Sequence, residues 1–262
     1  MASRTVLVTG AAGSVGSALV PRLADRGWDV RAIDLVRNES AVGQRIIGDC
    51  FDDSVLDAVL PGCHAIAHLA AVSGEAPLSD IAPSHITGFG RLLEAARRHG
   101  VRQVAFASSN HAVGFIPNDG RTAGVEVAAR PDGFYGVGKA AGEALCSLYA
   151  DRYGFRTVSI RIGSFRESPN TVRHLATWLS PDDLGAVFDA ALSAPGQGHS
   201  IVYGISRNKR RWWGLEPGRA IGYDPVDDAE DHLDTIDPQS GTPEELDYLG
   251  GSFAWRDRTT DA

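Results

Sequence analysis

The sequence predicts an α/β protein with a doubly wound parallel sheet, helices on both faces and a small C-terminal cap segment. Two observations predict this fold. Short apolar, β-branched segments alternate with amphipathic segments over residues 4–194, and a glycine cluster follows the first apolar segment directly. Strict alternation of strand and helix is typical of a parallel sheet, because each parallel strand needs a crossover connection to the next.

The individual elements follow from local patterns. Expected strands cover residues 4–9, 28–33, 45–47, 65–69, 101–107 and 157–162. Expected helices cover residues 13–26, 54–60, 79–99, 134–153 and 180–194. The helix over 79–99 ends in Arg97, Arg98 and His99 with Gly100 behind them, which is the composition that a helix C-terminus favours. The last helix begins with Ser180 as N-cap and Pro181 in its first turn.

After Gly204 the alternation is lost, and glycines, prolines and acidic pairs are scattered instead. We expect residues 1–204 to form a nucleotide-binding domain that also carries the catalytic residues. Residues 205–262 are expected to form a small cap or interface segment, preceded by a substrate loop over residues 163–180. Trp212 and Trp213 fit either a core or an interface between subunits.

Composition excludes several classes of protein. The chain has 262 residues, 25 Lys and Arg against 33 Asp and Glu, and a net charge of −8, which disfavours nucleic acid as a partner. No apolar run reaches the length of a membrane helix, and no secretory signal is expected. The three cysteines contain no C-x-x-C pair, which predicts a cytoplasmic protein without a metal site.

The glycine cluster predicts dinucleotide binding in a Rossmann-type fold. Gly10-Ala-Ala-Gly-Ser-Val-Gly16 lies between the first strand and the first helix, where glycines let the backbone approach a pyrophosphate. Asp34 closes the second strand, where a carboxylate binds the adenosine ribose hydroxyls. Arg37 could meet a 2′-phosphate, but a solvated loop arginine is the simpler interpretation. The pattern therefore favours NAD over NADP.

Tyr135 and Lys139 form a second candidate feature. The spacing i, i+4 places both side chains on one face of the helix over 134–153. A nearby ammonium stabilises a phenolate, so we expect the pKa of Tyr135 to be lowered and the phenol to act as a general base toward an alcohol. A surface pair without a catalytic role is the alternative.

Ala107-Ser-Ser-Asn-His111 ends the fifth strand. The carboxyl ends of parallel strands line the ligand crevice of an open sheet, so these polar side chains could hydrogen-bond a hydroxylated substrate. A turn with a helix cap would use the same residues.

Taken together, the glycine turn, Ser109 and the Tyr135/Lys139 pair resemble the extended short-chain dehydrogenase/reductase superfamily, which includes NAD-dependent epimerases and dehydratases. Further segments resemble the uronate dehydrogenase family more closely. They are Phe106-Ala-Ser-Ser-Asn-His-Ala-Val-Gly114, Ala129-Arg-Pro-Asp-Gly-Phe-Tyr-Gly136, Val158-Ser-Ile-Arg-Ile-Gly-Ser164, Thr177-Trp-Leu-Ser180, and Val202-Tyr-Gly204 followed by Trp212-Trp213. The resemblance covers nearly the whole chain.

The resemblance implies NAD-dependent oxidation of galacturonate or glucuronate, in the pyranose form, at the anomeric carbon to an aldarolactone. Tyr135 would be the general base, Lys139 would hold the phenolate and the nicotinamide ribose, and Ser109 would bond the reacting hydroxyl. The implied substrate contacts are Ser73, Ser109, Asn110, His111, Tyr135, Ser164 and Arg173. The implied cofactor contacts are Gly10, Gly13, Ser14, Val15, Gly16, Asp34, Leu35, Asp49, Cys50, Leu69, Ala70, Ala71, Tyr135, Lys139 and Ile162.

Two positions leave alternatives open. Arg173 lies on a loop after the sixth expected strand, where its planar guanidinium could bind the sugar carboxylate or could form a surface ion pair. His85 stands in the long helix where the family commonly has Asn. It could be a core histidine that bonds to backbone.

Two other functions compete with uronate oxidation. A sugar-nucleotide epimerase or dehydratase of the same superfamily would use the same fold, but such enzymes usually have a longer C-terminal region. A regulator that binds a dinucleotide without turnover would typically lack the tyrosine or the lysine, and this chain has both. The apolar helices predict a homo-oligomer, whereas the choice between galacturonate and glucuronate stays open.

Overall fold

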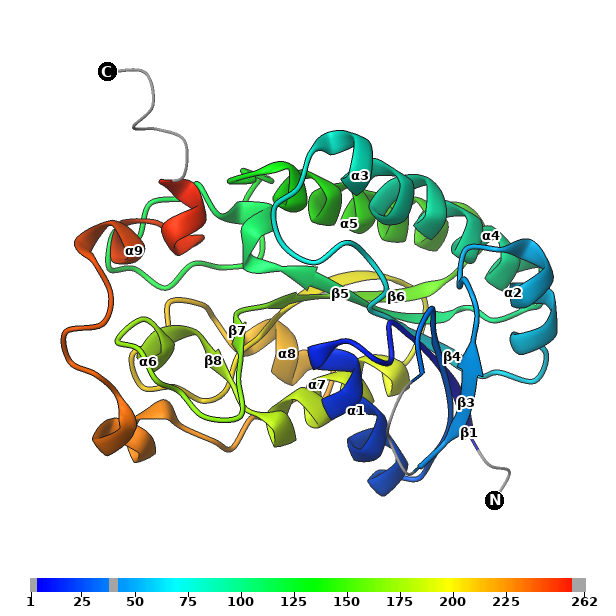
Figure 1. Ribbon diagram of the computed structural model, residues 1–262, viewed down its shortest axis with the longest axis horizontal. Helices are drawn as coiled ribbons and strands as arrows, with labels where there is room; N and C mark the ends of the chain where they lie inside the picture. The colour runs from blue at the N-terminus through cyan, green and yellow to red at the C-terminus, as the bar shows by residue number, and fades with distance from the viewer. Residues whose placement is uncertain (1–3, 38–41, 256–262) are drawn as a thin grey trace.

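Seven parallel strands form the central sheet of the computed structural model, which describes residues 4–37 and 42–255. The strands are β1 (Arg4–Thr9), β2 (Trp28–Asp34), β3 (Gln44–Ile47), β4 (Ala65–His68), β5 (Gln103–Ser109), β6 (Arg156–Ile162) and β9 (Gly198–Gly204). Their order is β3-β2-β1-β4-β5-β6-β9 (Figure 1). The order reverses between β1 and β4, and a ligand crevice is expected at that point of a doubly wound sheet. The predicted fold class is confirmed.

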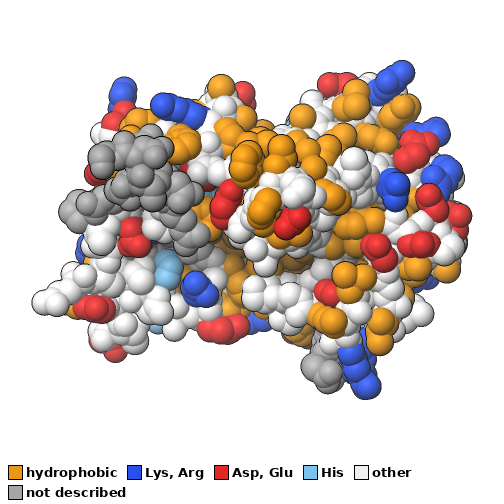
Figure 2. Space-filling view, turned by 45° about the horizontal axis from the view of Figure 1, so that its top comes forward, with side chains coloured by type: hydrophobic (Ala, Val, Ile, Leu, Met, Phe, Trp, Pro, Cys, Tyr) orange, Lys and Arg blue, Asp and Glu red, His pale blue; other side chains and the backbone are white. Residues whose placement is uncertain are grey.

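Helices cover both faces of this sheet (Figure 1). On one face lie α2 (Asp53–Val59), α4 (Phe89–Arg98) and α5 (Phe134–Tyr153), which pack into a core with Leu7, Ile66 and Phe106. On the other face lie α1 (Ser14–Asp25) and α7 (Pro181–Ser193), which pack into a second core with Val8, Ala67 and Ile160. Both cores are built from side chains that alternate across the same strands, as the pleat requires. In the space-filling view, apolar side chains gather across the middle of the face, with some acidic side chains among them (Figure 2).

Three strands were not expected from the sequence. β9 pairs in parallel with β6 along its whole length, from Arg156 opposite Gly198 to Ile162 opposite Gly204. Its first three residues are glycine, histidine and serine, so the apolar run is too short to indicate a strand without its neighbour. A separate pair, β7 (Ser164–Phe165) and β8 (Trp178–Leu179), frames the expected substrate loop together with α6 (His174–Thr177).

The expectation of a single continuous helix over residues 79–99 is wrong. The segment consists of α3 (Leu78–Ala82), a π-helical stretch η1 (Pro83–Gly88) and α4. Pro83 has no amide hydrogen and therefore cannot continue the α-helical hydrogen-bond ladder. The expected end of the segment is confirmed, since His99 caps α4 and Gly100 adopts a left-handed conformation with φ of 74°.

Residues 205–255 contain only short helices: α8 (Glu216–Ala220), η3 (Ala229–Thr235), α9 (Pro243–Asp247) and η4 (Gly251–Ala254). Trp213 is fully buried and stacks on Tyr203 at 5.2 Å between ring centroids, so its core interpretation is the right one. The ends of the two expected domains, residues 1–3 and 256–262, lie outside the described residues. Within the described part of the chain, no helix has the length and apolar character that crossing a membrane requires.

Candidate functional site

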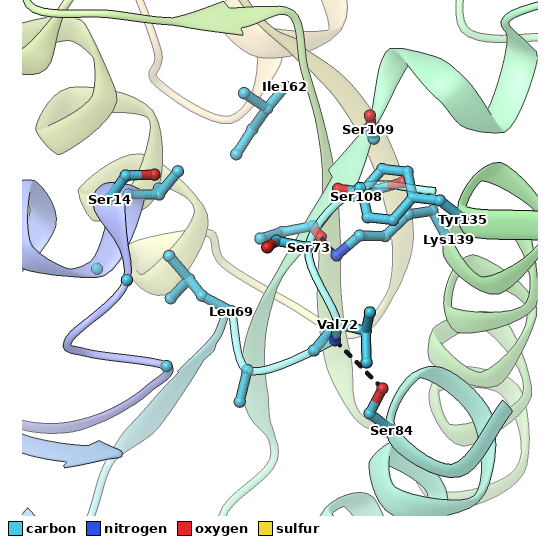
Figure 3. A pocket seen from close by; sticks show the side chains of 18 of the residues that line it. Ser14, Leu69, Val72, Ser73, Ser84, Ser108, Ser109, Tyr135, Lys139 and Ile162 are labelled. Atoms are coloured by element: carbon cyan, nitrogen blue, oxygen red, sulfur yellow. Dashed lines mark hydrogen bonds between the residues drawn. The ribbon is translucent and has the colours of Figure 1, made fainter. Parts of the chain in front are cut away.

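A cavity of about 1060 Å³ opens at the carboxyl ends of β1, β4, β5 and β6. All fifteen cofactor contacts implied by the resemblance line it, from Gly10 at one end to Ile162 at the other. Six of the seven implied substrate contacts line it too, namely Ser73, Ser109, Asn110, His111, Tyr135 and Ser164. Arg173 is the exception. Figure 3 shows that side chains from segments far apart in the sequence surround one space, among them Ser14, Leu69, Ser73, Ser109, Tyr135 and Ile162.

The glycine turn is shaped for an anion. Gly10 has φ of 69°, and a Cβ there would press on the backbone of Ala70. A Cβ on Gly16 would overlap the carbonyl of Gly10, so the turn closes only with glycine at both positions. The N-cap of α1 is Gly13, no side chain caps this end of the helix, and its first turn holds no acidic residue. Its amide groups and positive dipole end are therefore available to a pyrophosphate.

Asp34 lies at the end of β2 and lines the cavity beside the glycine turn. Its Oδ2 accepts a hydrogen bond from the Ala12 amide at 2.9 Å, and its Oδ1 accepts one from the Val36 amide at 3.3 Å. These bonds tie the carboxylate to the glycine turn and fix its direction. Burial raises the pKa of Cys50, which lines the same cavity, to about 12, so its thiol is neutral and unreactive. Arg37 is exposed and is not among the lining residues.

Tyr135 and Lys139 extend side by side from α5 into the cavity (Figure 3). Lys139 Nζ lies 5.4 Å from the centre of the Tyr135 ring and donates a hydrogen bond to the Ala107 carbonyl at 2.7 Å. Burial lowers the pKa of Lys139 to about 8. Burial also raises the pKa of Tyr135 to about 12, while a hydrogen bond with Ser109 acts in the opposite direction. The direction differs from the lowering expected from the sequence, because the cost of burying a phenolate exceeds the stabilisation that the neighbours offer.

The polar end of β5 serves two purposes at once. Ser109 accepts a hydrogen bond from the His111 amide at 3.2 Å and so caps the short helix η2 (Asn110–Val113). The helix-cap interpretation is therefore right, although Ser109 also lines the cavity beside Tyr135. Asn110 donates to the carbonyl of Leu249 at 2.9 Å, which connects β5 to the C-terminal segment.

Arg173 takes a position that neither interpretation of the sequence anticipated. Its guanidinium donates to the backbone carbonyls of Glu245 and Leu249, and lies 4.8 Å from the ring centre of Trp212. Burial lowers the pKa of Arg173 to about 10. Two other cationic or titratable side chains, Arg166 and His174, line the cavity together with Ser164, and sequence reasoning missed both.

Neighbouring side chains of η1 hold the loop after β4. Ser84 Oγ accepts a hydrogen bond from the amide of Val72 at 3.3 Å (Figure 3). His85 Nε2 donates one to the carbonyl of the same residue at 2.9 Å. Burial lowers the pKa of His85 to about 4, so the ring is neutral. His85 is thus the core histidine bonded to backbone that the sequence allowed, and together with Ser84 it fixes the loop that carries Ser73.

Comparison with known proteins identifies the family. Residues 6–201 match the model of the NAD dependent epimerase/dehydratase family. The chain belongs to that family. Since the family is NAD-dependent, NAD is confirmed as the cofactor expected from the sequence. No group of three or more His, Cys, Asp or Glu side chains among residues 4–37 and 42–255 is arranged to hold a metal ion.

Within this epimerase/dehydratase family, the chain is similar over nearly its whole length to uronate and glucuronic acid dehydrogenases. The chain is 39% identical over 255 residues to the uronate dehydrogenase of Pseudomonas putida, with 95% of each chain covered. A mutant uronate dehydrogenase from Agrobacterium tumefaciens, complexed with NAD, superposes with a TM-score of 0.87 at 37% identity over 96% of this chain and 97% of that one. Glucuronic acid dehydrogenase from Chromohalobacter salexigens superposes with a TM-score of 0.89 at 37% identity over 99% of both chains. The resemblance seen in the sequence is confirmed.

Proposed function

We propose that this protein is a uronate dehydrogenase that oxidises galacturonate or glucuronate, in the ring form, at the anomeric carbon to an aldarolactone. The observation that carries the proposal is the joint placement of Tyr135, Lys139 and Ser109 in one cavity with the glycine turn. The similarity to uronate and glucuronic acid dehydrogenases over nearly the whole chain supports the choice of substrate.

Each side chain has a role that follows from its placement. Ser109 and Tyr135 would bond the anomeric hydroxyl, and Tyr135 Oη would take its proton as the C1–H bond breaks. NAD supplies the hydride acceptor and, in its oxidised nicotinamide ring, a positive charge that favours the phenolate form of Tyr135. Lys139 adds a second positive charge beside the ring and would bond the nicotinamide ribose. The pyrophosphate would lie on the N-terminus of α1, and Asp34 would accept bonds from the adenosine ribose.

The carboxylate of the substrate needs a cation at the end of the cavity remote from the glycine turn. We assign this task to Arg173, which the family resemblance implies and which lies next to the lining residue His174. Its guanidinium would exchange a backbone carbonyl for the carboxylate, a stronger charge-assisted partner. Arg166 at the rim is the alternative cation.

The test is a spectrophotometric assay of NADH formation with galacturonate, glucuronate, their neutral parent sugars and a nucleotide sugar. We expect turnover with one or both uronates. Turnover with the nucleotide sugar alone would support the epimerase alternative. NAD binding without any turnover would support the regulator.

Compartment and assembly are proposals as well. We expect a cytoplasmic homo-oligomer, as composition and apolar helices predicted. The N-terminal half of α5 exposes Phe134 (49%) and Val137 (38%), and its C-terminal half exposes Leu148 (47%). Light scattering of the purified protein measures the oligomeric state, and a monomer at micromolar concentration would contradict the expectation.

A further inference from the structure

His111 and Asp132 form a hydrogen-bonded pair in the wall of the cavity. His111 Nδ1 lies 2.8 Å from Asp132 Oδ2, and the two residues are 21 positions apart in the chain. The Asp132 side chain is completely shielded from solvent, whereas the His111 side chain is 18% exposed and lines the cavity. The imidazole of His111 therefore faces the cavity, and the carboxylate of Asp132 is buried behind the imidazole.

The carboxylate occupies a space that two glycines leave free. A Cβ on Gly114 or on Gly250 would overlap Asp132 Oδ2. These glycines come from opposite parts of the chain and are joined by a hydrogen bond from the Gly250 amide to the Gly114 carbonyl at 2.9 Å. The second oxygen of the carboxylate, Oδ1, is buried without a hydrogen-bond partner among the described residues. Burying a carboxylate with so few partners is costly, so packing alone does not account for it.

The direction of the hydrogen bond defines the state of the imidazole. A carboxylate only accepts hydrogen bonds, so His111 Nδ1 must carry the proton. In the neutral ring, Nε2 is then an unprotonated acceptor. Nε2 makes no hydrogen bond to any residue that the structure describes and is not among the buried unpartnered atoms. It is available to a molecule in the cavity.

Two aromatic rings fix the plane of His111. Phe253 stacks on it with 4.2 Å between centroids, and Tyr135 meets it edge-on with 5.8 Å between centroids. With its tautomer and its plane both set, the imidazole can present Nε2 in only one direction, beside the ring of Tyr135.

We propose that Asp132 is a positioning residue that holds His111 with Nε2 as the acceptor for a hydroxyl of the sugar substrate. The inference rests on the proposed function, because it adds a specificity contact to the same site. Asp132 does not line the cavity, so it would reach the substrate through His111. A carboxylate that orients a histidine in this way is typically worth about 10- to 100-fold in the function of that histidine where the histidine binds a metal, and we expect a similar factor here.

The chain contains a matched control. His99 Nε2 lies 2.8 Å from Asp57 Oδ1, but this pair joins α4 to α2 at the surface, with the Asp57 side chain 53% exposed. Neither residue lines the cavity. Asp57→Ala thus removes a histidine–carboxylate bond of the same length without touching the site.

Kinetics of single and double variants separate positioning from structure. We expect Asp132→Ala to lower kcat/KM for the uronate about 10- to 100-fold, with the Kd for NAD changed less than about threefold and with Asp57→Ala near wild type. Asp132→Asn, which keeps the volume, should fall between wild type and Asp132→Ala. In a His111→Ala background, Asp132→Ala should cause no further loss. An equal further loss in that background, or wild-type kinetics of Asp132→Ala, would overturn the inference.

Nitrogen NMR of the histidine side chains tests the same inference without substrate. The His111 signals are assigned by their disappearance in His111→Ala. We expect a protonated Nδ1 and an unprotonated Nε2 in the wild type, and a change in that pattern in Asp132→Ala. An Nε2-protonated neutral ring in the wild type would contradict the proposal even if uronate turnover is observed. If the NMR pattern of His111 is the expected one but the protein does not oxidise uronates, the His111–Asp132 pair is supported and the proposed function is overturned.

Discussion

Glu75 caps the helix that carries Tyr135. Its Oε1 accepts a hydrogen bond from the Phe134 amide at 2.8 Å, and its Oε2 accepts one from the Tyr135 amide at 3.1 Å. The N-cap residue of α5, Gly133, has no side chain, so this acceptor comes from a loop 60 residues earlier in the chain. The same loop carries Ser73, and the bonds therefore tie a proposed substrate contact to the proposed catalytic helix.

Replacing Glu75 by Ala should affect both stability and turnover. Two amide groups at the start of α5 lose their acceptor, which should cost about 0.5 to 2 kcal/mol in the free energy of unfolding. kcat should fall several-fold because Ser73 and Tyr135 are no longer held together. Glu75→Gln keeps an acceptor and should lose less. The control is Asp52→Ala, which removes the cap of α2 and should lower the melting temperature without changing kcat at saturating NAD.

Replacing Tyr135 by Phe should nearly abolish turnover. The phenol is the only proposed proton acceptor for the anomeric hydroxyl, and general-base catalysis is worth about 10² to 10⁴ in rate. Steady-state assays measure the loss, and fluorescence titration with NAD should show an unchanged Kd. If the variant kept a tenth or more of the wild-type rate, the base would be another group.

The rate should depend on pH in a direction that follows from the two pKa shifts. Because burial raises the pKa of Tyr135 to about 12, the base form is scarce at neutral pH, and kcat/KM should rise as pH increases from 6. Above pH 8 the rise should flatten, since the pKa of Lys139 is lowered to about 8 and its charge is then lost. A profile of kcat/KM from pH 6 to 10 measures this. A rate that falls steadily over that range would contradict the assignment.

Replacing Asp34 by Ala should narrow the preference for NAD over NADP. The carboxylate would accept bonds from both ribose hydroxyls and repel a 2′-phosphate. kcat/KM with each cofactor, measured for wild type and variant, gives the ratio. Asp34→Asn controls for the hydrogen bond to the Ala12 amide, because it removes the charge and keeps an acceptor. Equal or better use of NADP by the wild type would refute the role of Asp34.

Replacing Arg173 by Ala should lower kcat/KM for galacturonate about 10- to 1000-fold, because charge-assisted bonds to a carboxylate are worth roughly 1.5–3 kcal/mol each. Arg173→Lys should recover only part of the lost kcat/KM, since an ammonium cannot form the two parallel hydrogen bonds of a guanidinium. The decisive comparison is with galactose, which has no carboxylate. An equal loss for both sugars would mean that Arg173 only secures the carbonyls of Glu245 and Leu249. Arg166→Ala, tested in the same way, examines the alternative cation.

Sequence reasoning predicted the parts of the site that depend on local spacing. The turn from Gly10 to Gly16 and the pair Tyr135 and Lys139 each lie within one short segment, so spacing alone indicates their geometry. Glu75, Asp132 and the carbonyl of Leu249 gave no such signal. They act through contacts 59, 21 and 139 residues away, which only the folded chain creates. The strand β9 was missed for the same reason, since its polar first half becomes a strand by pairing with β6.

The π-helical stretch η1 makes this part of the fold sensitive to chain length. Ser84 and His85 form hydrogen bonds with the amide and the carbonyl of one residue, Val72. Both lie in a π-helix, which has more residues per turn than an α-helix. Deleting one residue from Pro83–Gly88 would return the segment to regular α-helix. The wider turn of the π-helix absorbs that extra residue, so the flanking helices would keep their faces, while Ser84 and His85 inside the stretch would shift relative to Val72. The loop to Ser73 would lose its anchor, although such a deletion leaves the apolar composition of the helix almost unchanged. In alignments of homologues, an indel in this helix would therefore mark an altered substrate site.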